Sequence, residues 1–170
     1  LPNLTYLNCS FNGGGGPGSP YILTSINISG SYALTQLLCA FNAITNLDIA
    51  NHTNLTYLEC SQNQLNSLPV SNLTNLSFLN CSNNNLSSLD IGNLTNLNIL
   101  SCADNQISSL AVSNLVNLTQ LDCSQNQLTV LDVAPLLQLT ELKCRSNQIS
   151  SLNLLPLTQL TVFNADSNPL

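Results

Sequence analysis

Residues 55–68 read LTYLECSQNQLNSL, and the spacing within this stretch recurs along almost the whole chain. Leucines stand five and two residues before Cys60, and an asparagine stands three residues after it. The cysteine position returns every 21 residues after a first interval of 30, at Cys9, Cys39, Cys60, Cys81, Cys102, Cys123 and Cys144, with Ala165 in the eighth unit. A pattern that returns at a fixed period indicates a repeat architecture in which each unit packs against the next.

The alternation around Cys60 indicates a β-strand, because successive side chains of a strand point to opposite faces. Leu58 and Cys60 are expected to face the core, while Tyr57 and Glu59 face outward. A second inward set returns along the opposite wall and consists of Leu65, Leu68, Val70 and Leu73. Each unit therefore reads as one turn of a coil, and stacked turns share a continuous core.

An asparagine follows the cysteine position by three residues in all eight units. This predicted structural ladder consists of Asn12, Asn42, Asn63, Asn84, Asn105, Asn126, Asn147 and Asn168. The asparagine falls where the chain leaves the strand, so its side-chain amide is expected to satisfy backbone groups of the bend.

The unit L-x-x-L-x-C-x-x-N-x-L resembles the leucine-rich repeat, L-x-x-L-x-L-x-x-N-x-L, with cysteine in the third leucine place. Its short period, and the tails NSLPVSNLTN (66–75) and SSLDIGNLTN (87–96), are similar to bacterial surface types such as internalin-like proteins. The resemblance implies an α/β-class repeat solenoid. It would be a right-handed coil of about eight units, with a parallel β-sheet on its concave face and a mostly irregular or 3-10 convex side. We predict a single domain over residues 1–170, a segment of a longer protein, with a loop insertion at 13–22.

The seven cysteines admit three interpretations: packing, scattered disulfides, or a metal or redox function. Neighbouring cysteines on parallel strands would point the same way, which fits the disulfide geometry poorly. The C-x₂-C spacings of metal sites do not occur. Free cysteine behaves as a small buried hydrophobe. We therefore predict structural buried thiols at Cys9, Cys39, Cys60, Cys81, Cys102, Cys123 and Cys144, and no metal site.

Charge and motifs narrow the class of function. Charged residues make up 6% of the chain, the net charge is −6, and the two basic residues are Lys143 and Arg145. So little positive charge argues against nucleic acid and anionic membranes as partners, and no apolar run is long enough for membrane insertion. His52 is the single histidine, and nucleophile-elbow, P-loop and dinucleotide motifs are missing. The sequence thus predicts a protein that is not an enzyme and needs no cofactor.

The outward strand positions are the candidate site, because function in the leucine-rich-repeat family usually lies on the concave sheet. Buried positions barely vary between units, whereas these positions change at each step. The predicted ligand-binding residues are Tyr6, Phe11, Phe41, Tyr57, Glu59, Phe78, Asn80, Ile99, Asp104, Asp122, Glu141, Lys143 and Arg145. Exposed neighbouring aromatics suit protein or carbohydrate contacts, and packing among themselves is the alternative. The charged members form either a surface charge network or a specificity patch.

By resemblance, the chain is a non-catalytic recognition module. It is an adhesin-like protein, extracellular or at the cell surface, that binds a protein or carbohydrate ligand through the concave sheet. The alternative is self-association into a filament of units stacked end to end, because neither end shows a polar cap. A minor alternative is ice binding by a threonine ladder that Ser77 and Asn98 interrupt, formed by Thr5, Thr35, Thr56, Thr119, Thr140 and Thr161.

Overall fold

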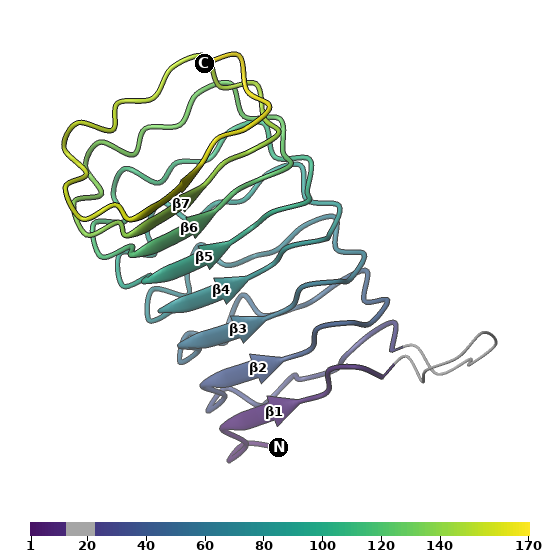
Figure 1. Ribbon diagram of the computed structural model, residues 1–170. Coiled ribbons are helices and arrows are strands. Elements are labelled where there is room, and N and C mark those ends of the chain that lie inside the picture. Colours follow the sequence, from purple (N-terminus) through teal and green to yellow (C-terminus); the bar gives the residue numbers. More distant parts are fainter. Residues whose placement is uncertain (13–22) are drawn as a thin grey trace.

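The computed structural model describes residues 1–12 and 23–170, so the predicted insertion at 13–22 lies outside the described residues. Eight short parallel strands stack in chain order into one sheet (Figure 1). The strands are β1 (Tyr6–Asn8), β2 (Gln36–Leu38), β3 (Tyr57–Glu59), β4 (Phe78–Asn80), β5 (Ile99–Ser101), β6 (Gln120–Asp122), β7 (Glu141–Lys143) and β8 (Val162–Asn164). The leucine-rich-repeat solenoid that the sequence predicts is confirmed.

The strand register follows the sequence period. In the pairing of β3 with β4, Tyr57 lies opposite Phe78, Leu58 opposite Leu79, and Glu59 opposite Asn80. Every position of the repeat therefore forms a column that runs along the coil. We call the solvent-exposed side of the sheet, which is the predicted concave face, the sheet face.

The core is one continuous cluster between the strands and the opposite wall of the coil. Leu58, Leu79 and Leu100 on the strands are fully buried, and so are Leu65 and Leu86 on the opposite side. Burial of apolar area provides most of the stabilisation, at roughly 25 cal/mol per Å². Because the leucine columns continue from coil to coil, each unit completes the core of its neighbours.

The asparagine ladder joins adjacent coils. Asn84 Nδ2 donates hydrogen bonds to the carbonyls of Cys81 and Ser82 in its own coil, and of Cys60 in the preceding coil. Its Oδ1 accepts the backbone N–H of Leu65, at 2.9 Å. The same four contacts recur at Asn63, Asn105, Asn126 and Asn147. Each of these amides, buried or half-buried, thus satisfies backbone groups of the bend and bonds two coils to each other.

The residue before each of these asparagines adopts a left-handed backbone conformation. Its φ lies between 53° and 59° at Phe11, Phe41, Gln62, Asn83, Asp104, Gln125, Ser146 and Ser167. This region is unfavourable for residues other than glycine, and asparagine and aspartate tolerate it best. The hydrogen bonds of the ladder hold the chain in this conformation and turn it away from the strand.

The side opposite the sheet is irregular, with single turns in place of a helix. Leu73 N donates to Val70 O at 2.8 Å and Leu76 N donates to Leu73 O at 2.9 Å, and these i→i+3 bonds recur in the other coils. None of the described residues forms a helix, so the described part of the chain has no helix that could cross a membrane. Of the two forms expected for the convex side, the structure shows the irregular one.

A second asparagine column, which sequence analysis did not single out, borders these turns. Its Nδ2 atoms donate to carbonyls of the preceding coil at 2.9 Å, from Asn54 to Tyr32, Asn75 to Thr53, Asn96 to Thr74 and Asn117 to Thr95. The coil is therefore tied to its neighbour on both sides of the strand.

Candidate ligand-binding surface

The cysteine column lies under the strands. Six thiols are buried, Cys9 is half-buried, and all seven are free. Burial raises the pKa of Cys39 and of Cys81 to about 12, and that of Cys144 to about 11. A thiol acts as a nucleophile or metal ligand in its thiolate form, so these side chains are unreactive near neutral pH. In residues 1–12 and 23–170, no three histidine, cysteine or acidic side chains come together as a metal site.

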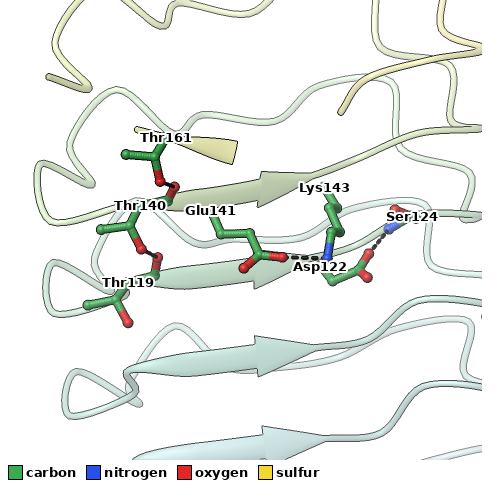
Figure 2. Close-up of polar contacts among 7 residues, drawn as sticks. All are labelled: Thr119, Asp122, Ser124, Thr140, Glu141, Lys143 and Thr161. Atoms are coloured by element: carbon green, nitrogen blue, oxygen red, sulfur yellow. Dashed lines mark hydrogen bonds and ion pairs between the residues drawn. The ribbon is translucent and has the colours of Figure 1, made fainter. Parts of the chain in front are cut away.

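The threonine column borders the strands on their amino-terminal side and bonds to the protein itself. Thr140 Oγ1 donates to Thr119 O at 2.9 Å, and Thr161 Oγ1 donates to Thr140 O at 3.1 Å (Figure 2). Ser77 and Thr119 make the same bond to their preceding coils, while Asn98 Nδ2 donates instead to Asn117 O. Apart from Thr5, the threonine hydroxyls of this column therefore donate to the preceding coil and connect the coils.

The aromatic residues of β3 and β4 pack against each other on the sheet face. The rings of Tyr57 and Phe78 are stacked, with centroids 4.1 Å apart and planes 3° apart. Ile99 follows Phe78 in register, and all three side chains are half-buried. Tyr6 stands apart from them, because Gln36 lies between it and Tyr57 in the register. Cross-strand packing thus occurs, and it leaves an apolar stripe partly open to solvent.

Polar side chains at the ends of the strands are held by local hydrogen bonds. Glu59 Oε1 accepts the N–H of Ser61 at 3.0 Å, and Asn80 Oδ1 accepts that of Ser82 at 3.1 Å. Asn80 Nδ2 also donates to Glu59 Oε2 at 2.9 Å. Each acceptor satisfies a backbone N–H where the chain leaves the sheet. The two predicted site residues Glu59 and Asn80 are therefore fixed in orientation.

A hollow of about 440 Å³ lies at the carboxyl-terminal end of the first four strands. Each of the four coils contributes three residues to its lining. Asn8, Leu38, Glu59 and Asn80 form one wall; Ser10, Ala40, Ser61 and Ser82 form the floor; and Phe11, Phe41, Gln62 and Asn83 form the other wall. Sequence analysis missed the floor, although its signal is visible. A serine or alanine follows the cysteine in each of the first six units, at Ser10, Ala40, Ser61, Ser82, Ala103 and Ser124.

Two phenylalanines stack at the rim of the hollow. The Phe11 and Phe41 rings have centroids 4.3 Å apart and planes 13° apart. They remain 69% and 46% exposed, although both occupy the unfavourable left-handed position. The left-handed conformation recurs at this position in all eight coils and belongs to the scaffold. What distinguishes Phe11 and Phe41 is that two large aromatic rings are exposed side by side.

The charged residues gather at the opposite end of the sheet face. Lys143 forms an ion pair with Glu141 on β7 (Figure 2). The hydrogen bond to Glu141 raises the pKa of Lys143, against a smaller opposing effect of desolvation. Asp122 accepts the N–H of Ser124 instead, at 3.0 Å, and Arg145 is exposed. Among the described residues this is the single ion pair, so the predicted network reduces to one contact.

The predicted site residues therefore fall into three groups and four separate positions. Phe11, Phe41, Glu59 and Asn80 line the hollow; Tyr57, Phe78 and Ile99 form the stripe; Glu141 and Lys143 form the ion pair; and Tyr6, Asp104, Asp122 and Arg145 stand apart. Asp104 is engaged locally, since its Oδ1 accepts a hydrogen bond from Gln125 Nε2.

Comparison with known proteins agrees with this geometry. A sequence model described as Leucine Rich Repeat matches residues 54–76. The functional domain of InlJ from Listeria monocytogenes, which includes a cysteine ladder, is 36% identical with a TM-score of 0.70, and the match covers 98% of this chain and 40% of that one. A leucine-rich-repeat protein of Leptospira interrogans is 27% identical with a TM-score of 0.85, over 99% of this chain and 44% of that one.

An internalin of Listeria monocytogenes, InlF, is 26% identical with a TM-score of 0.70, over 82% of this chain and 49% of that one. The chain thus spans less than half the length of these structural relatives. No curated protein sequence matches it. The repeat in eight registers, the parallel sheet and these likenesses show that the chain belongs to the leucine-rich-repeat family and resembles its bacterial, internalin-like members.

Proposed function

We propose that the protein is a non-catalytic recognition module that binds a partner protein through the sheet face, and that it acts outside the cell as an adhesin-like protein. The observation that carries this proposal is the apolar stripe of Tyr57, Phe78 and Ile99, which lies half-exposed on three consecutive strands. Aromatic side chains at the centre of a surface dominate binding energies when a partner covers them.

The rigidity of the coil supports the same function. Because the asparagine ladder fixes each coil to its neighbours, the side chains of the stripe are held at a constant register. A preorganised surface loses little conformational entropy on binding. The variable columns of the sheet face then set specificity, while the constant columns maintain the scaffold.

Two observations support the absence of catalysis. The buried thiols are protonated near neutral pH because burial raises their pKa. His52, the single histidine, is 3% exposed, and its Nε2 lies 3.2 Å from the carbonyl oxygen of Ile28, away from the sheet face. Leucine-rich-repeat solenoids are typically recognition scaffolds, and extracellular action is inferred from the internalin-like relatives.

The test is a binding screen against purified extracellular matrix and cell-surface proteins, immobilised on an array. The triple variant Tyr57→Ser, Phe78→Ser, Ile99→Ser should lose the binding that the unaltered chain shows. A matched triple variant off the sheet face, Val116→Ser, Leu137→Ser, Leu155→Ser, removes three exposed apolar side chains and should retain it. Equal binding by both variants would refute the proposal.

A further inference from the structure

We infer that the hollow across the first four coils is a subsite for one neutral pyranose ring of a glycan. The inference rests on the proposed function, because the hollow lies on the same sheet face and would recognise a sugar that the partner carries. Three properties of the hollow support this inference: an exposed pair of stacked aromatic rings, a fixed polar pair, and the absence of positive charge among the described residues of its lining.

The aromatic wall offers a flat surface. Phe11 and Phe41 occupy equivalent places in neighbouring coils and stack almost parallel, so their ring normals run along the coil axis. The second face of Phe41 therefore points toward the third coil, where Gln62 and then Asn83 continue the column without an aromatic ring. A pyranose presents C–H groups on one ring face, and that apolar face packs well on an aromatic ring.

The opposite wall offers oriented hydrogen-bonding groups. Glu59 and Asn80 are bonded to each other and to the N–H groups of Ser61 and Ser82, as described above. A carboxylate accepts up to about four hydrogen bonds and an amide nitrogen donates two, so both side chains keep unused capacity toward hydroxyl groups. Vicinal hydroxyls at the edge of a pyranose match such planar groups, whose orientation is already fixed.

The charge of the lining residues favours a neutral sugar over an acidic one. Glu59 is the only charged residue among those that line the hollow, and the two cations of the chain, Lys143 and Arg145, are far along the coil on and after β7. An acidic sugar would be repelled by Glu59 and would find no counter-charge. The volume of about 440 Å³ lies in the range of small-molecule sites, and the floor of serine and alanine leaves that space open.

The experiment is saturation-transfer NMR of the whole chain with neutral oligosaccharides that cover the common configurations: cellotetraose, mannotriose, galactotriose and chitotriose. We expect saturable binding of at least one of them at millimolar concentration, and none of trigalacturonate. Phe41→Asn should weaken that binding by about tenfold, the effect of a lost stacking contact. This variant keeps the fold, because asparagine suits the left-handed position and already occupies it at Asn83.

A second variant and a control complete the design. Ser82→Leu fills the floor while its backbone bond to Asn80 remains, and should abolish binding. Gln120→Ala, on the sheet face outside the hollow, should leave it unchanged. No binding of any neutral probe, or binding that survives both Phe41→Asn and Ser82→Leu, overturns the subsite. If the array partner still depends on Tyr57, Phe78 and Ile99, then the recognition module stands and only the sugar subsite is refuted.

Discussion

Asn63 Oδ1 accepts a hydrogen bond at 3.0 Å from the backbone N–H of Ile44, which lies one coil earlier. The Nδ2 group of the same side chain donates to the carbonyl of Cys39 at 2.9 Å, again in that earlier coil. One side-chain amide therefore bonds to the preceding coil both as an acceptor and as a donor. The stacking of coils thus has a polar contribution from this residue beside the apolar contribution of the leucine columns.

Replacement of a ladder asparagine should be strongly destabilising. In Asn126→Ala the N–H of Ile107 loses its partner. The carbonyls of Cys102 and Cys123 each lose one of two hydrogen bonds and keep the one from Asn105 or Asn147. A buried unsatisfied polar group costs about 1–3 kcal/mol, so the N–H of Ile107 and the weakened carbonyl contacts together should cost about 2–3 kcal/mol. Urea unfolding measures it. The control Asn72→Ala, at an exposed turn position, should change stability by less than about 0.5 kcal/mol; similar losses in both variants would contradict this role.

A reciprocal exchange tests the left-handed position. Gln62→Asn should raise the free energy of unfolding by about 0.5 kcal/mol, because asparagine tolerates positive φ better than glutamine. Asn83→Gln, the reverse change in the next coil, should lower it by a similar amount. Urea midpoints of the two variants should therefore shift in opposite directions. A shift in the same direction would show that side-chain contacts, and not the backbone conformation, determine which residue is more stable at this position.

Stability should fall in alkaline solution because of the thiol column. The folded pKa of Cys39 and of Cys81 is about 12, above the ordinary value of 9.0, so the folded state holds these protons longer than the unfolded state does. The thiols stabilise the fold fully below pH 9, and this contribution is lost as the pH rises from 9 toward 12. Each thiol lowers the free energy of unfolding by up to about 1.4 kcal/mol per pH unit in that window.

Urea unfolding between pH 8 and pH 11 measures this slope. Cys81→Ala should make it shallower, although the cavity lowers stability at every pH. A control at a position without a thiol, Leu79→Ala, should lower stability and keep the slope. An unchanged slope in Cys81→Ala would show that other groups cause the alkaline loss.

The ion pair of β7 should matter little for folding. Lys143 and Glu141 are on the solvated face, with side chains 44% and 27% exposed, and such pairs contribute about 0–1 kcal/mol. Glu141→Gln should therefore change the urea midpoint only slightly, and the difference should vanish in 1 M salt. A large loss that persists at high salt would indicate a structural role that the exposure of the pair does not suggest.

The repeat period was sufficient to predict the solenoid, because leucine, cysteine and asparagine return in register in every unit. The hollow was not predicted, because it depends on relations between columns. The sequence does not show that the Ser61 N–H donates to one carboxylate oxygen of Glu59. Nor does it show that Phe41 adopts a left-handed backbone conformation with its ring stacked on Phe11. These depend on backbone conformation at the strand end, which a period in sequence does not specify.

The nearest-neighbour bonding of the coils has a consequence for the evolution of this protein. Duplication or loss of one 21-residue unit leaves every remaining contact between coils intact, whereas a change of length between the strand and its ladder asparagine would shift the columns. The first interval of 30 residues keeps the register, because its extra residues come after Asn12. Each inserted coil lengthens the sheet by about 4.8 Å. A unit added between β5 and β6 would move the ion pair of β7 away from the aromatic stripe by that step. The distance between the apolar and charged ends of the sheet face can thus change by one coil at a time, without substitutions at either end.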